Sequence, residues 1–130
     1  SKQGVLRGLH IQKGDFPQAK LVRVLQGEIL DVVVDVRKNS PTYGQYLSVE
    51  LSAENKKQIF VPRGFLHGFS VLSEQATVLY KCDSFYDPAS EDSCNPLDPT
   101  LNIDWKLGNQ ELILSDKDRN AQSFVQFKPY

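Results

Sequence analysis

The chain contains only two histidines, His10 and His67, and both lie where acid–base chemistry is possible. The same chain, which the residue pattern indicates to be a small β domain, also contains Arg7, Lys20 and Tyr80. Imidazole is the usual general base or acid near neutral pH, and cations beside it suit an anionic substrate. The alternative is that each histidine is a hydrogen-bonded structural residue, because both have apolar neighbours.

A metal site is a second possibility for the same histidines. Pro62, Gly64 and His67 fit P-x-G-x-x-H, the second half-motif of the cupin sandwiches, whose metal-dependent members take two more histidines and a carboxylate from the first half-motif. Here His10 stands alone in the earlier segment. Because divalent metals generally require three or four protein ligands, we expect a metal-free site without a cofactor. A metal-dependent cupin oxygenase or isomerase that uses both histidines is the competing hypothesis.

Composition narrows the class of protein. The chain has 130 residues, a hydrophobic content of 40%, a charged content of 24% and a formal net charge of −1. These values are typical of one globular domain, here residues 1–130, and lack the basic excess of nucleic-acid binders. No apolar run approaches the roughly 20 residues of a membrane-spanning helix. We therefore expect neither a nucleic-acid nor a membrane partner.

The cysteines and the first residue indicate the cellular compartment of the protein. Cys82 and Cys94 show neither zinc-site spacing nor a dense disulfide framework, so free thiols in a reducing compartment are expected. The chain begins at Ser1 without an apolar leader, which suggests a processed or truncated polypeptide and not a secretory precursor. The expected location is the cytoplasm.

Short runs of alternating or branched residues, separated by turn residues, predict strands. In the segment from Glu28 to Val36, every second residue from Leu30 onward is apolar, so that set should face a core. Helical periodicity is scarce, and residues 109–117 are too short to decide. Many short strands with little helix predict an all-β sandwich or small barrel. The predicted strands are Leu21–Leu25, Glu28–Val36, Gln45–Leu51, Gln58–Val61, Gly68–Leu72 and Ala76–Cys82. After Tyr86 a long irregular stretch follows, and such loops tend to be functional or mobile.

Seven segments, in order and spacing, resemble the dTDP-4-dehydrorhamnose 3,5-epimerase family, and the resemblance runs from about Gly4 to Asp118. It implies a cupin-type jelly-roll β-sandwich, a homodimer and a reaction without metal or cofactor. The implied reaction inverts C3 and C5 of dTDP-4-keto-6-deoxyglucose to give dTDP-4-keto-rhamnose. The segments are Gly4–Gln12, Lys20–Val24, Asp31–Gly44, Leu51–Asn55, Pro62–Phe69, Leu79–Lys81 and Ser115–Asp118.

The resemblance also implies roles for individual residues. The histidine of L-H-x-Q, His10, is the expected general base, and Asp118 of S-x-K-D orients it. Tyr80 of L-Y-K is the expected acid on the opposite face of the sugar, and Lys20 of K-L-V-R is expected near the C4 oxygen. The expected substrate-binding residues are Arg7, at the diphosphate, with Gln12, His67, Lys117 and Tyr86.

Each role has an ordinary structural alternative. Tyr80 could be a sheet aromatic with its hydroxyl at the surface, because tyrosine is common in strands. Lys20 and Arg23 could both be solvent-facing charges on one strand face. Asp118 could belong to a solvated charge run together with its charged neighbours.

The chain departs from the family pattern in two ways. Family members carry a further N-terminal segment before the part that begins here, which takes part in the dimer and the nucleotide site. Ile11, Phe85 and Pro96 also replace aromatic residues that the family often has, which bears on substrate fit. Two alternatives therefore stand beside the double epimerase: an epimerase that acts at C3 alone, and a sugar-nucleotide-binding cupin without activity.

Overall fold

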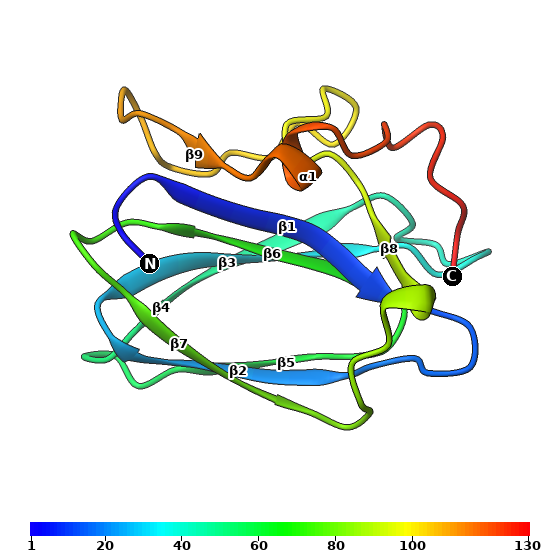
Figure 1. Ribbon diagram of the computed structural model, residues 1–130, viewed down its shortest axis with the longest axis horizontal. Helices are drawn as coiled ribbons and strands as arrows, with labels where there is room; N and C mark the ends of the chain where they lie inside the picture. The colour runs from blue at the N-terminus through cyan, green and yellow to red at the C-terminus, as the bar shows by residue number, and fades with distance from the viewer.

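Two β-sheets, antiparallel apart from one short parallel pair, face each other in the computed structural model, which describes residues 1–130 (Figure 1). The large sheet has the strand order β4-β3-β6-β1-β8, with β9 beside β1, and the small sheet has the order β5-β2-β7. This confirms the prediction of an all-β sandwich with little helix. The strands are β1 Val5–Gln12, β2 Lys20–Gln26, β3 Glu28–Asp35, β4 Tyr46–Ser52, β5 Gln58–Val61, β6 Phe65–Val71, β7 Thr77–Cys82, β8 Glu91–Ser93 and β9 Ile113–Leu114.

The six predicted strands correspond to β2 to β7, while β1, β8 and β9 were not predicted. In β1 the pairing register with β6 shifts between Arg7 and His10, so the period of two that marks a strand is interrupted. The undecided segment 109–117 contains β9 and the start of the single-turn helix α1, Asp116–Arg119. A 3₁₀ turn, η1, spans Pro88–Ser90.

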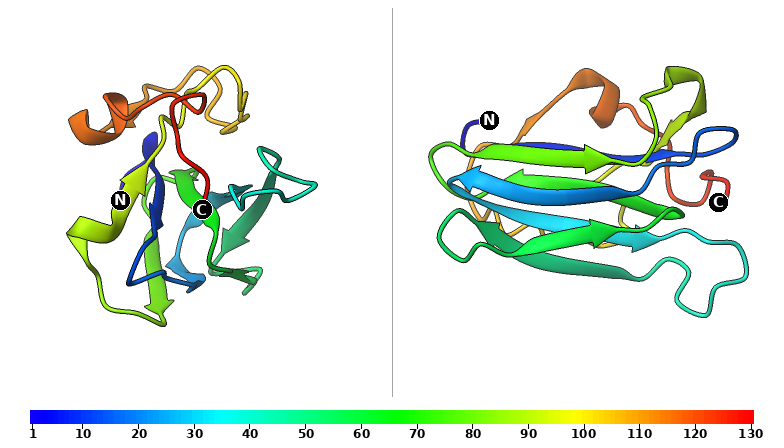
Figure 2. Two further views of the ribbon diagram at one scale, coloured as in Figure 1. Left: turned by 90° about the vertical axis from the view of Figure 1, so that its right-hand side faces the viewer. Right: turned by 90° about the horizontal axis from the view of Figure 1, so that it is seen from below.

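One core lies between the large sheet and the irregular C-terminal third of the chain. Figure 2 shows this segment, yellow to red, lying over the large sheet on the side away from the small sheet. The apolar set of β3 that begins at Leu30 packs here, as predicted. Members of this core are Leu6, Leu9, Ile11, Leu30, Val32, Val34, Val36, Leu66, Cys94, Leu101, Trp105, Leu114 and Phe127.

The second core fills part of the space between the two sheets. Its members are Val5, Val22, Val24, Ile29, Val33, Leu51, Val61, Phe69, Val71 and Ala76. Because both faces of β3 are covered, the alternate set of β3 residues is buried as well, including the acidic Asp31. The remaining inward positions, toward the ends of β1 and β7 and the starts of β2 and β6, carry polar side chains.

The structure also shows the state of the cysteines and the length of the helices. Both cysteines are free thiols, Cys82 exposed and Cys94 buried. No helix of the chain is long and apolar enough to cross a membrane.

Candidate functional site

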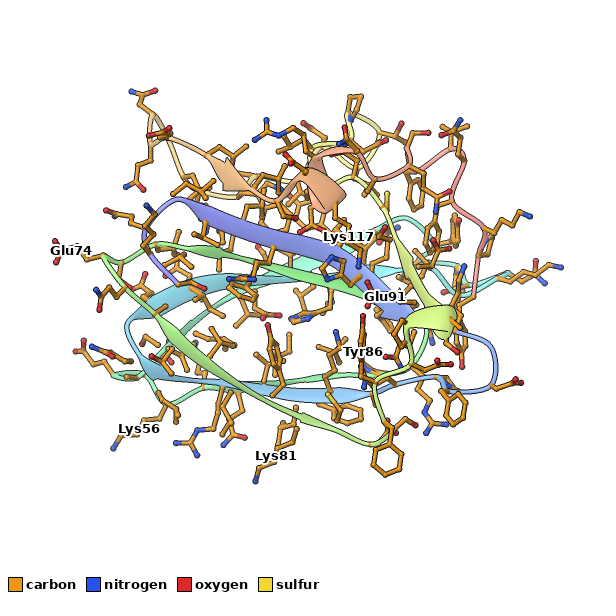
Figure 3. The ribbon with its side chains drawn as sticks, viewed as in Figure 1. Lys56, Glu74, Lys81, Tyr86, Glu91 and Lys117 are labelled. Atoms are coloured by element: carbon orange, nitrogen blue, oxygen red, sulfur yellow. The ribbon has the colours of Figure 1, made fainter.

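Polar side chains from both sheets gather in the space between the sheets (Figure 3). His10 and His67 are register partners on β1 and β6 of the large sheet. On the small sheet, Lys20 of β2 lies opposite Cys82 of β7, and Tyr80 lies two residues earlier on the same face of β7. Strand order therefore places residues that are far apart in sequence around one cleft.

His10 is held by a carboxylate from the C-terminal layer. The Asp118 Oδ1 atom lies 2.7 Å from His10 Nε2, and Asp118 Oδ2 accepts a hydrogen bond from the Gly8 backbone N–H at 3.1 Å. Asp118 lies in α1, whose N-cap Ser115 accepts a hydrogen bond from the Asp118 backbone N–H. The turn of α1 thus carries the carboxylate to β1, and Asp118 is buried instead of lying in a solvated charge run.

The electrostatics of Asp118 favour the ionised carboxylate. Burial acts to raise the pKa of Asp118, but the hydrogen bonds from His10 and from the Gly8 backbone outweigh burial and lower it below its usual value. A carboxylate that is charged at neutral pH and bonded to one ring nitrogen of His10 fixes the tautomer, so the other ring nitrogen is able to accept a proton.

His67 forms a second, fully buried pair with a carboxylate. Its Nε2 lies 3.0 and 2.9 Å from the two carboxylate oxygens of Asp31. Edge-on to this imidazole is the ring of Tyr80, with centroids 6.1 Å apart. Asp31 was not predicted as a site residue from the sequence. An acidic residue inside the apolar run of β3 is nevertheless a recognisable signal, because a buried charge needs a partner.

Tyr80 faces the space between the sheets, where it is 43% exposed, and not the outer surface of the small sheet. Removal from water raises the pKa of Tyr80 to about 12, with the Asp31 charge adding to the effect. Its hydroxyl therefore stays protonated at neutral pH. Together with Arg7, Phe69 and Val78, Tyr80 lines a cavity of about 320 Å³.

Lys20 also faces the cleft, with its Nζ 6.0 Å from the centroid of the Tyr80 ring. Burial lowers the pKa of Lys20, and the nearby Cys82, Asp31 and Glu91 oppose that effect. The expectation that Lys20 and Arg23 could share a solvent-facing strand face is wrong. Three positions separate them, so they point to opposite sides of β2, and only Arg23 lies on the exposed outer side.

An ion pair closes one side of the cleft. Lys117 of α1 donates to the Glu91 carboxylate of β8, and Tyr86 lies close to both (Figure 3). Burial acts to raise the pKa of Glu91, but Lys117, His10 and Tyr86 together lower it below its usual value. Sequence analysis missed Glu91, which lies in the irregular stretch after Tyr86, where no periodicity gives its direction.

The Gln12 side chain is engaged by the loops beside the cleft. Its amide nitrogen donates to the backbone oxygens of Phe16 and Phe85, and its amide oxygen accepts from the Asp87 backbone N–H. All of its polar atoms are therefore engaged by loops, and the side chain is 4% exposed. That Gln12 also contacts substrate stays a prediction.

The other predicted site residues occupy three zones. His10, Lys20, His67 and Tyr80 face the space between the sheets, with Asp118 behind His10. Lys117 and Tyr86 lie at the rim, and Arg7 lies in the adjoining cavity. No three His, Cys, Asp or Glu side chains come close enough together to hold a metal ion.

This arrangement suits proton transfer on two faces of one substrate. The large sheet presents an imidazole with a partner carboxylate, which is a competent base. The small sheet presents an undissociated phenol, which is a proton donor, and an ammonium group, which stabilises negative charge that develops between them.

Comparison with known proteins gives a consistent result. The family model described as dTDP-4-dehydrorhamnose 3,5-epimerase matches residues 1–126. The dTDP-4-dehydrorhamnose 3,5-epimerase of Shigella flexneri is 50% identical over 125 residues, which are 96% of this chain and 68% of that protein. The chain thus spans about two thirds of the length of the curated relatives that it matches.

Solved structures agree in fold. The dTDP-4-dehydrorhamnose 3,5-epimerase of Elizabethkingia anophelis NUHP1 superposes with a TM-score of 0.95 at 56% identity, covering 100% of this chain and 70% of that one. The 3,5-epimerase of Legionella pneumophila Philadelphia 1, in complex with dTDP-4-keto-L-rhamnose, gives 0.93 at 50% identity, covering 100% and 71%. A 3'-monoepimerase of Streptomyces bikiniensis in complex with dTDP-quinovose gives 0.89 at 42% identity, covering 96% and 63%.

Proposed function

The chain belongs to the dTDP-4-dehydrorhamnose 3,5-epimerase family, and on this basis we propose that it epimerises dTDP-4-keto-6-deoxyglucose at C3 and C5 to give dTDP-4-keto-rhamnose. The observation that carries the proposal is the 2.7 Å contact between His10 and the buried Asp118 in a cleft whose other wall presents Tyr80. It supplies a base and an acid on different sheets.

The proposed reaction begins with proton removal next to a ketone. The C4 carbonyl acidifies the C–H bonds at C3 and C5, so one base on one face of the sugar can remove each proton in turn. His10 takes the proton, and Asp118 stabilises the imidazolium that forms. The electron pair moves onto the C4 oxygen and gives an enolate. Lys20, a partly buried cation in the cleft, stabilises this oxygen.

Inversion requires that the proton returns from the opposite face. Tyr80 holds its proton at neutral pH and lies on the opposing sheet, so it can donate to the carbon while His10 keeps the proton that it removed. Before the second inversion, His10 releases that proton to solvent and Tyr80 takes one up from solvent. Arg7 lines the cavity beside Tyr80, and its planar guanidinium fork suits the diphosphate of a nucleotide sugar. These residues supply base, acid and charge stabilisation, so the proposed chemistry calls for no metal.

The decisive experiment is NMR of dTDP-4-keto-6-deoxyglucose with the protein in D₂O. Replacement of the C3 and C5 protons by deuterium, together with inversion at both carbons, is the expected result, unchanged by a chelator. His10→Asn and Tyr80→Phe should each abolish inversion while circular dichroism shows an intact fold. Exchange at rates close to wild type in both variants would contradict the assignment.

Two other functions give different results in the same experiment. Exchange at C3 alone indicates a single epimerase. The similarity to the Streptomyces bikiniensis 3'-monoepimerase supports this function as the second candidate. Tight binding of dTDP without exchange at either carbon indicates a sugar-nucleotide-binding protein. Activity that a chelator removes indicates the metal-dependent cupin.

We also infer a homodimer. Several large apolar side chains of the small sheet are exposed, including Leu25, Phe60 and Leu79, and burying such a patch favours association. Light scattering should give twice the 14.7 kDa of one chain. A mass of one chain at micromolar concentration would contradict the inference.

A further inference from the structure

Gln12 clamps the backbone on both sides of Tyr86. Its amide nitrogen donates to the carbonyl oxygen of Phe85 at 3.1 Å, and its amide oxygen accepts from the N–H of Asp87 at 3.1 Å. These two peptide groups immediately precede and follow Tyr86. A third hydrogen bond, to the Phe16 carbonyl oxygen at 3.0 Å, ties the β1–β2 loop to the same amide.

The orientation of this amide is determined by its partners. A reversed amide would set its oxygen against two carbonyl oxygens and its NH₂ group against an N–H, so only one orientation satisfies all three partners. Gln12 is buried, and all three hydrogen bonds of its side chain go to loop backbone, so its amide holds the loops.

Gln12 lies on the same strand as the candidate base. Gln12 lies two residues after His10 on β1, and its register partner on β8 is Glu91. Glu91 in turn binds Lys117 and lies close to Tyr86 at the rim of the cleft. Gln12 therefore connects the strand that carries His10 to the loop that carries Tyr86 by a short, hydrogen-bonded path.

We propose that Gln12 is a positioning residue that fixes Tyr86 over the cleft and thereby keeps the sugar in place through both epimerisations. This rests on the proposed function. Double epimerisation requires that the sugar stay bound after the first inversion and turn its second carbon toward the same base. A rim that is held in position favours retention, whereas a loosened rim releases sugar that is inverted at one carbon only.

The neighbouring Gln18 provides a matched control. It donates to the Ser84 carbonyl oxygen at 2.9 Å and so links the same two loops, but two residues away from Tyr86. Substitution of Gln18 should loosen the loops without releasing either peptide group that flanks Tyr86. A general effect of loop mobility would appear in both variants, and the proposed effect in only one.

The test measures the ratio of doubly to singly inverted sugar, by NMR in D₂O, for wild type, Gln12→Met, Tyr86→Ala, the double variant and Gln18→Ala. Gln12→Met keeps the volume of the side chain and should lower the ratio at least about fivefold, the change that one ordinary hydrogen bond corresponds to. Tyr86→Ala should lower it similarly. The double variant should resemble Tyr86→Ala, because Gln12 acts through Tyr86. Gln18→Ala should keep the wild-type ratio.

A wild-type ratio in Gln12→Met or in Tyr86→Ala would overturn the proposal, as would equal effects of the Gln12 and Gln18 substitutions. If Gln12→Met does not fold, Gln12→Asn replaces it, since it keeps the amide but shortens its reach, and the same decrease is expected. Failure of the proposed function is distinguishable, because wild type itself would then give no doubly inverted sugar, with exchange at C3 alone or at neither carbon.

Discussion

Replacing Asp118 by Asn tests whether the carboxylate sets the protonation state of His10. Asp118 accepts from the Gly8 N–H through Oδ2 and contacts His10 Nε2 through Oδ1. An asparagine in this place must turn its oxygen to Gly8, since an NH₂ group there would oppose the N–H. The NH₂ group then faces His10 and donates to Nε2, so the proton moves to the nitrogen that must act as base.

The expected magnitudes follow from this geometry. Asp118→Ala removes a hydrogen bond to a charged group, worth about 1.5–3 kcal/mol, and should slow proton abstraction roughly 10- to 150-fold. Asp118→Asn removes the same bond and also imposes the wrong tautomer, an effect of up to about 10⁴-fold in the comparable aspartate-to-asparagine change of a serine protease triad. The asparagine variant, although closer in shape, should therefore be the slower of the two.

The assay is the initial rate of deuterium incorporation at C3 under saturating dTDP-4-keto-6-deoxyglucose at neutral pH. Binding of dTDP, measured by calorimetry, should be unchanged in both variants, because neither substitution removes a group assigned to the nucleotide. If Asp118→Asn retained a rate within about threefold of wild type, Asp118 would not control the base. An alanine variant slower than the asparagine variant would refute the tautomer argument specifically.

Three further outcomes follow from the cleft and its surroundings. Burial lowers the pKa of Lys20, so the charge of Lys20, and with it the activity, should be lost as pH rises through a value below 10.5. Tyr80 keeps its proton over this range, because its pKa is raised to about 12. Lys20→Arg should therefore extend activity to higher pH. Asp35→Asn should lower the free energy of unfolding in urea by about 2–4 kcal/mol at pH 7, because the hydrogen bonds from Arg37, Ser40 and Thr42 are weakened. These bonds also lower the pKa of Asp35. The difference in stability between wild type and variant should therefore shrink as pH falls below the usual carboxyl range. Iodoacetamide should label the exposed Cys82 in the cleft, and dTDP-sugar should slow this labelling. Cys94 should be protected until the protein unfolds, because it is buried and burial raises its pKa to about 12.

The strands of the fold could be predicted where the side chains alternate strictly. β3 is the clearest case, since the apolar set from Leu30 to Val36 does face a core. The strand that carries His10 could not be predicted in the same way. Its register shifts between Arg7 and His10, so residues on either side of the shift do not follow one alternation.

The site could be predicted in its residue types but less well in its connections. The pairing of His10 with Asp118 depends on a single helical turn that only the packing of the C-terminal layer places beside β1. Gln12 belongs to the same motif as His10, so the resemblance suggested a substrate contact. Its hydrogen bonds depend on the position of the two loops that follow β1 and β7, and no local pattern in the sequence specifies how such loops meet.

The inward polar residues fall into two groups that differ in partners. Asp118, Asp31 and Gln12 are satisfied within the chain, by His10, His67 and the loop backbone. Lys20 and Arg7 have no ion-pair or hydrogen-bond partner within the chain, although both lie in or beside the cleft with Tyr80. Because withdrawing a cation from water without a counter-charge is costly, the partly buried Lys20 favours an anionic ligand that supplies the charge, while the exposed Arg7 is free to contact one. A nucleotide sugar with a diphosphate and an enolate that forms at C4 supplies negative charge at two places, which matches one cation in the cleft and one in the adjoining cavity.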